Sequence, residues 1–111
     1  MTHLTAAFSA LADETRFSIV EKLLAKGTCT AGELGEVAPI SAPAISRHLK
    51  VLREAGLVEQ RIKGPQRIYS VNPKAMREIA DWTLSHRAFW EGSLDRLETA
   101  LASLEDSDGN A

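Results

Sequence analysis

Apolar residues recur every three or four positions through the first third of the chain, which predicts three helices there. The first helix covers residues 4–11. The second runs from the cap residue Asp13 to about Lys26, and the third, a short one, covers residues 31–37 after the cap residue Thr30. Aspartate and threonine are favoured caps because their side-chain oxygens accept hydrogen bonds from the free N–H groups of the first helical turn.

The stretch from Ser41 to Arg53 predicts a fourth helix whose two faces differ in character. Ser41 is a favoured N-cap, Pro43 suits the first turn because its missing N–H would be unpaired there, and Gly56 ends the helix. One face is an apolar stripe made of Ile45, Leu49 and Leu52. The opposite face is small and hydroxylated first and cationic further along, and it carries Pro43, Ser46, Arg47 and Lys50.

Two strand patterns follow, at residues 57–62 and 67–71, and the breaker-rich turn at residues 63–66 between them predicts a hairpin. The short helix, tight connection and basic helix within residues 30–55 are typical of a helix-turn-helix, and the hairpin within residues 57–71 is typical of its wing. The predicted fold class is therefore mainly α with a small β-hairpin, a winged helix-turn-helix with five helices plus the wing.

The last helix pattern covers residues 73–105, with a bend or interruption expected at Ser85-His86 or at Gly92. Its second half carries a heptad seam made of Trp90, Leu94, Leu97, Leu101 and Leu104. A helix this long cannot bury its whole apolar side against so small a body. The partner is either a second copy of the chain, which is the more economical solution, or the chain's own core after folding back. The predicted dimer interface comprises Leu4, Phe8, Leu11, Phe89, Trp90, Leu94, Leu97 and Leu101.

The composition is that of one globular domain covering residues 1–111, because 44% of the residues are hydrophobic and 25% are charged. No apolar run is long enough to cross a membrane, and the N-terminus lacks the pattern of a secretion signal. The single Cys29 cannot form an internal disulfide, so a reducing, cytoplasmic location fits. A redox role for Cys29 stands beside the simpler role of a small, semi-buried side chain.

Charge is distributed unevenly along the chain. The net charge is −2, yet residues 41–74 hold seven lysines and arginines against two acidic residues. A basic segment in an acidic chain is expected where one surface meets phosphate, so we predict contact with double-stranded DNA. His48, about 60° from the apolar stripe, either supports the helix or touches a phosphate. The predicted DNA-binding residues are Ser41, Ala42, Pro43, Ser46, Arg47, His48, Lys50, Arg53, Arg61, Lys63, Gln66 and Arg67.

Several sequence blocks within residues 5–92 resemble the ArsR/SmtB family of bacterial winged-helix repressors. They are Leu11-Ala12-Asp13-Glu14-Thr15-Arg16, Ile19-Val20 with Leu23-Leu24, Gly32-Glu33-Leu34, the run from Ser41 to Val58, and Arg67-Ile68-Tyr69. The resemblance implies a homodimer that occludes a promoter and leaves the DNA when an effector, such as a small molecule, binds. A symmetric dimer would present two recognition helices about one DNA turn apart, on a palindromic operator.

Many members of that family sense metals, and here the sequence departs from their patterns. The helix before the turn has Glu33-Leu34-Gly35-Glu36 where paired cysteines are needed. On the last helix Asp81 and His86 point about 140° apart, and Thr83 stands where a histidine is needed. A transition-metal site needs several convergent nitrogen or sulfur ligands, so we predict neither a metal nor a cofactor. The stretch 86–91 resembles a non-metal subgroup of the family.

Two other classes of function are alternatives to a DNA-binding regulator. An enzyme needs a nucleophile with a base, a metal site or a phosphate loop, and the sequence contains no glycine-rich phosphate loop and no clustered Cys/His set. A winged helix can also serve as a protein-interaction module without binding DNA. The cations at Arg47, Lys50, Arg61, Lys63 and Arg67 favour the regulator.

Overall fold

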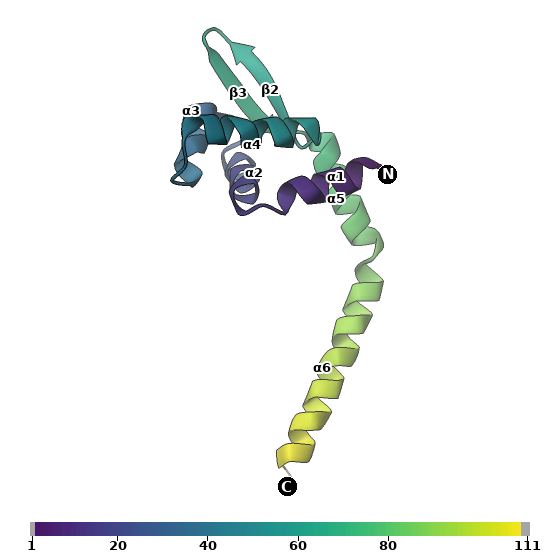
Figure 1. Cartoon of the computed structure of the whole chain (residues 1–111). Helices are drawn as coiled ribbons and strands as arrows, with labels where there is room; N and C mark the ends of the chain where they lie inside the picture. Colours follow the sequence, from purple (N-terminus) through teal and green to yellow (C-terminus); the bar gives the residue numbers. More distant parts are fainter. Residues whose placement is uncertain (1, 110–111) are drawn as a thin grey trace. The chain divides into compact units, whose positions relative to one another are not determined.

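The computed structural model describes residues 2–109, which form six α-helices, a short 3₁₀ helix and three strands (Figure 1). In chain order these are α1 (Thr2–Leu11), α2 (Glu14–Lys26), β1 (Cys29–Thr30), α3 (Ala31–Leu34), the 3₁₀ helix η1 (Gly35–Val37), α4 (Ala42–Glu54), β2 (Val58–Lys63), β3 (Gln66–Val71), α5 (Pro73–Ser85) and α6 (Arg87–Gly109). The chain divides into two compact units, residues 1–79 and residues 80–111, and the division falls within α5.

The starts of α2 and α3 follow the capping chemistry that the sequence predicts. The Asp13 carboxylate accepts a hydrogen bond from the backbone N–H of Arg16 at 2.9 Å, and Gly27 ends α2 with a φ of 89°. At α3, the Thr30 hydroxyl accepts from the Glu33 N–H at 3.2 Å while the Glu33 carboxylate accepts from the Thr30 N–H at 3.1 Å. This reciprocal capping box satisfies two backbone donors at once.

The helix α4 also matches its prediction at both ends. The Ser41 hydroxyl accepts from the Ala44 N–H at 3.3 Å, and Pro43 lies in the first turn. Gly56 follows the helix with a φ of 79°, a conformation that glycine adopts without strain. The apolar stripe of α4 faces inward and is no more than 2% exposed; it consists of Ile45, Leu49 and Leu52.

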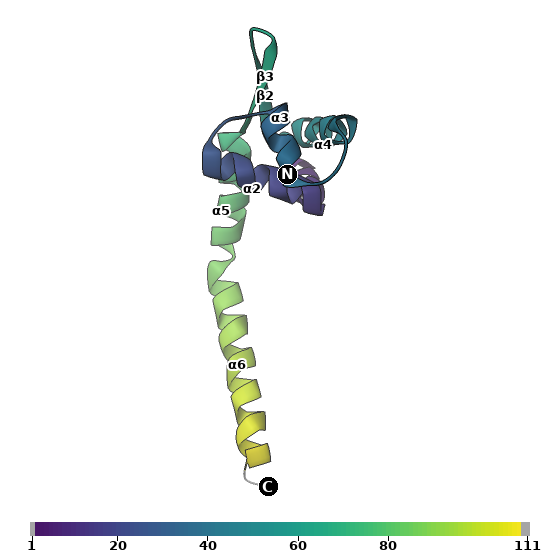
Figure 2. The same cartoon turned by 90° about the vertical axis from the view of Figure 1, so that its left-hand side faces the viewer.

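The sheet has three antiparallel strands in the order β1-β3-β2. The predicted hairpin is β2–β3, and Gly64 in its two-residue turn has a positive φ of 61°. Both views show the hairpin extending beyond the helices of its unit (Figures 1 and 2). The strand β1, which pairs Cys29 with Tyr69, was not predicted because two residues are too few to show alternation. Residues 35–37, predicted as α-helix, form η1 instead.

The core of the first unit is built from α1, α2, α3, α4 and the sheet, which surround one apolar cluster. Its largest fully buried side chains are Ile19, Leu23, Leu34, Leu49, Leu52 and Leu57. The helix α4 packs against α1, α2, α3 and β2, so its inner face is held from several sides. α1 buries Ala7 and Ala10, while Phe8 is 38% exposed. The orientation of α4 is therefore fixed within this unit.

In the second unit the C-terminal pattern forms two helices, because the backbone is interrupted at His86. The Ser85 hydroxyl donates to the carbonyl of Trp82 at 2.9 Å, and His86 Nδ1 lies 2.8 Å from the same oxygen. The His86 N–H turns instead to the Thr83 carbonyl at 3.3 Å. Side chains thus replace the usual helical hydrogen bond. The prediction of five helices is corrected to six, with the break at His86, and Gly92 lies within α6.

The apolar side chains of α6 are exposed in the single chain. All five residues of the predicted seam are exposed, and so is Phe89. Phe89 packs edge-on against Trp90, the first residue of the seam, with ring centroids 5.1 Å apart. Such a run of large exposed apolar side chains is typical of a surface that takes part in an interaction. No helix in the described part of the chain has both the length and the apolar character needed to cross a bilayer.

Candidate nucleic-acid interface

The outer face of α4 is open to solvent along its length. The residues predicted to enter the DNA groove are all exposed there, namely Ser41, Ala42, Pro43, Ser46, Arg47 and Lys50, and Arg53, predicted to contact the DNA backbone, is exposed as well. The first four have short side chains, so the N-terminal end of α4 allows close approach of another surface. The cations lie further along the helix. This arrangement meets the steric and electrostatic requirements of a helix that enters a DNA major groove.

The described part of the chain offers no strong ion-pair partner to Arg47 or Lys50, two exposed cations of α4. Lys50 Nζ lies 3.9 Å from Glu54 Oε1, and both side chains are more than two-thirds exposed. Such an exposed pair contributes little, so Lys50 is available to a phosphate or base. Within residues 2–109 the Arg47 guanidinium makes no ion pair within 4.0 Å. Both side chains therefore remain free to meet a partner.

His48 differs from the other residues in the predicted set because its ring faces inward. His48 Nδ1 lies 3.3 Å from Arg16 Nη1 and 3.8 Å from the Asp13 carboxylate. Since arginine only donates hydrogen bonds, Nδ1 accepts from Arg16. The Arg16 Nε group in turn donates to the Ala10 carbonyl at 2.7 Å. Of the two roles open to His48, these contacts favour supporting α4 against the corner between α1 and α2.

The wing presents polar and cationic side chains on both of its faces. Arg61, Lys63, Gln66 and Arg67 are all exposed. Lys63 pairs with Gln66 across the hairpin next to the turn, whereas Arg67 pairs with Ile62 on the opposite face. Ile62 is 73% exposed, an apolar side chain on the wing surface that the sequence analysis does not single out. The wing can therefore present cations to a phosphate backbone from either face.

Cys29 has the surroundings of a structural residue. Its side chain is buried in the core beside Tyr69, its partner in the sheet. Burial raises the pKa of the Cys29 thiol, and the nearby Glu33 carboxylate adds to this shift. A raised pKa leaves less thiolate, which is the reactive form. These surroundings favour the role of a small core side chain over that of a redox sensor.

The described residues contain no group of three or more His, Cys, Asp or Glu side chains arranged to hold a metal ion. Glu33, on the helix before the turn, instead serves the capping box and accepts from Lys26 at 3.2 Å. His86 directs Nδ1 at the Trp82 carbonyl. Glu33 and His86, which stand near the family's two metal positions, thus have other partners in this chain.

Comparison with known proteins places these features in one class. Residues 11–61 match a family model described as a helix-turn-helix domain. The chain is 43% identical to the HTH-type transcriptional regulator Rv2034 of Mycobacterium tuberculosis over 107 residues, which cover 94% of this chain and 90% of that protein. It is 37% identical to the transcriptional repressor SdpR of Bacillus subtilis over 78 residues, covering 70% of this chain and 86% of that protein.

A solved structure shows the same fold. The ArsR-like transcriptional regulator from Rhodococcus sp. RHA1 aligns with a TM-score of 0.68 and 30% identity, over 88% of this chain and 92% of that chain. The matches confirm the resemblance drawn from the sequence blocks, and they identify a regulator rather than an enzyme. The chain belongs to the ArsR/SmtB family of winged-helix, DNA-binding transcriptional regulators.

Proposed function

We propose that this protein is a homodimeric repressor that binds a palindromic operator and thereby occludes a promoter. The observation that carries the proposal is the exposed outer face of α4, whose inner face is locked in the core. A rigid helix with short residues at one end and free cations beyond them fits the major groove. The name of the similar SdpR protein, a transcriptional repressor, favours repression over activation.

The proposed interface divides into two sets of contacts. The N-terminal end of α4 reads bases, with Arg47 and Lys50 hydrogen-bonding guanine edges or nearby phosphates. The wing fixes the register of the protein on the DNA backbone or in the minor groove. The base-reading set comprises Ser41, Ala42, Pro43, Ser46, Arg47 and Lys50, and the positioning set comprises Arg53, Arg61, Lys63, Gln66 and Arg67.

The proposed dimer forms through the first and last helices of the chain. The exposed apolar side of α6 needs a covering surface, and the same surface of a second copy supplies it with matched chemistry. The helix-turn-helix of residues 30–55 and the wing of residues 57–71 then act as the DNA-binding part and residues 73–105 as the dimerisation part. The proposed interface residues are Leu4, Phe8, Leu11, Phe89, Trp90, Leu94, Leu97 and Leu101. The site of action is the cytoplasm, where bacterial DNA lies.

The test is a binding titration of the purified chain against DNA fragments from upstream of its own gene, at a series of salt concentrations. We expect one fragment to bind far more tightly than unrelated DNA of equal length. The logarithm of its binding constant should fall linearly with the logarithm of salt concentration. Failure to bind any fragment at low salt would contradict the proposal and favour the protein-interaction module.

A further inference from the structure

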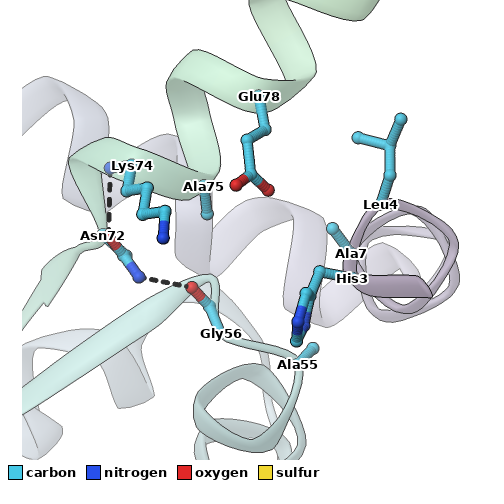
Figure 3. Close-up of a pocket in the computed structure, with 9 residues that line it drawn as sticks. All are labelled: His3, Leu4, Ala7, Ala55, Gly56, Asn72, Lys74, Ala75 and Glu78. Carbon is cyan, nitrogen blue, oxygen red and sulfur yellow. Dashed lines mark hydrogen bonds between the residues drawn. The ribbon is translucent and has the colours of Figure 1, made fainter. Parts of the chain in front are cut away.

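A cavity of about 250 Å³ lies within the first unit, where α1, the end of α4 and the start of α5 meet (Figure 3). The proposed DNA contacts do not use it. Its inner wall is apolar: Ala7 is buried, and Leu4 and Ala75 are half-buried. Pockets for drug-sized ligands begin at about 300 Å³, so this cavity suits a smaller molecule.

Three ionisable side chains border the cavity. Lys74 and Glu78 project toward it from successive turns of α5, and His3 faces them from α1 (Figure 3). Lys74 and Glu78 stand four residues apart, a spacing that allows an ion pair on a helix. Yet among residues 2–109 neither of them, nor His3, forms an ion pair within 4.0 Å. Lys74, Glu78 and His3 are all exposed, so an ammonium and a carboxylate border one small cavity at the surface, each without a charged partner among the described residues.

We propose that this cavity binds a small zwitterion, namely a free α-amino acid with an apolar side chain. The Glu78 carboxylate would receive the ligand's ammonium group, and Lys74, assisted by His3, would receive its carboxylate. The wall formed by Ala7 and Ala75 would cover the apolar side chain, whereas Leu4, at the rim, belongs to the proposed dimer interface. A ligand with one charge satisfies one of the two facing groups and leaves the other unpaired, so the pair selects for both charges.

The cavity adjoins the joint between the end of α4 and the start of α5. Asn72 Nδ2 donates to the Gly56 carbonyl at 2.9 Å, and the Asn72 N–H donates to the Leu57 carbonyl at 2.8 Å. Asn72 and Gly56 both line the cavity. A bound amino acid would contact this joint together with α1, so it would favour one arrangement of the start of α5 relative to the end of α4 over others. This coupling to DNA rests on the proposed function, whereas ligand binding itself does not.

The direct test is calorimetric titration of the full-length chain, without DNA, against each of the common amino acids. We expect at least one apolar amino acid to give a saturable isotherm. For leucine, the matched probes are 3-methylbutylamine, which lacks the carboxylate, and 4-methylpentanoate, which lacks the ammonium. Each single-charge probe should bind at least about tenfold more weakly than its parent amino acid. A chain that binds no amino acid, or that binds a single-charge probe equally well, overturns the proposal.

Two variants locate the binding. Lys74→Gln and Glu78→Gln should each weaken binding at least about tenfold. Arg77→Gln, on the same helix but outside the cavity lining, should leave it unchanged. Shifts of backbone amide signals of the parent chain provide a second measurement that needs no variant, and they should centre on residues 55–56 and 72–78. Binding that both variants leave intact, or shifts centred elsewhere, would refute this location.

The two proposals fail separately. A chain that binds an amino acid but no DNA loses the proposed repressor function and keeps the cavity assignment. A chain that binds its operator but no amino acid keeps the repressor function and loses the cavity assignment. When both bindings are present, the bound amino acid should change operator affinity, and the Glu78→Gln variant should abolish that change.

Discussion

The helices α4 and α6 both carry an apolar stripe, but the stripe of α4 is buried and the stripe of α6 is exposed. In α4 the apolar stripe is no more than 2% exposed, whereas Leu94, Leu97 and Leu101 of α6 are each more than half exposed. Burial fixes α4 and leaves its polar side facing solvent. Exposure leaves α6 with an apolar side that gains free energy when another surface covers it. The single chain therefore fixes the orientation of α4, whereas it leaves the apolar side of α6 uncovered.

The largest effect is expected from a truncation at the buried face of α4, where it should reduce the stability of the fold. Leu52→Ala should lower the free energy of unfolding by about 2–5 kcal/mol, because it leaves a cavity in a close-packed core. Urea unfolding of the parent and the variant measures the difference. A cost below about 1 kcal/mol would mean that α4 is not held by this face.

The same type of truncation on α6 should affect association instead of folding. Leu97→Ala removes an exposed side chain, so the proposed dimer should lose about 1.5 kcal/mol per subunit, or roughly a hundredfold in its dissociation constant. Sedimentation equilibrium measures this constant. The matched control is Glu98→Ala, at the next position, which should leave it within about threefold. If the dissociation constant of Leu97→Ala equals that of the parent, the seam is not part of the dimer interface.

On the polar side of α4, Arg47→Ala should weaken operator binding by about 1–3 kcal/mol and relax the preference at one base pair. The reason is that a guanidinium on a base edge supplies both affinity and discrimination. Anisotropy titrations against the operator and its single-base variants measure both effects. Arg77→Ala, the same change outside the proposed interface, serves as the control. Operator binding as tight as that of the parent would withdraw the base-reading role from Arg47.

The wing should contribute affinity without discrimination. Lys63→Ala should weaken binding to all sequences about equally and by less than Arg47→Ala does. It should also lower the salt slope by about 1, since one phosphate contact is lost. Titrations at several salt concentrations with operator and unrelated DNA measure this. A loss confined to one base position would contradict a backbone role for Lys63.

How far the sequence predicts the structure depends on how local the deciding interactions are. Caps such as Asp13, Thr30 and Ser41 act within three residues, so their helices were predicted with accurate starts. The strand β1 depends on pairing between Cys29 and Tyr69, forty positions apart, and it was missed. The break near His86 was expected at either of two places, and only the hydrogen bonds to the Trp82 carbonyl select one.

In the candidate site, too, features set by local interactions were predictable and features set by distant residues were not. Helical periodicity alone placed Arg47 and Lys50 opposite the apolar stripe, and the structure leaves both exposed. The inward turn of His48 depends on Asp13 and Arg16, which lie on another helix and its cap, so periodicity left two roles open. The amino-acid cavity joins three segments distant in sequence, and no spacing pattern reports such a site.

The smallest expected effect is the loss of stability at acid pH, and it arises from the carboxyl groups at the starts of α2 and α3, the helices that pack against α4. The pKa of the Asp13 carboxyl lies below its ordinary value, chiefly because the Arg16 N–H donates to it. The pKa of the Glu33 carboxyl is lowered chiefly by the Thr30 N–H. A lowered folded-state pKa stabilises the fold above the ordinary carboxyl value, and this stabilisation disappears as the pH falls through the folded-state value.

Paired variants separate this charge effect from the loss of a cap. Asp13→Asn and Glu33→Gln each keep a capping oxygen but cannot titrate. The double variant should therefore lose less stability than the parent when urea unfolding is compared between neutral pH and a pH below the ordinary carboxyl values. Equal losses in both proteins would show that other carboxyl groups set the acid sensitivity. A smaller loss in the double variant would instead show that the ionised caps help to hold the helices on which α4 rests.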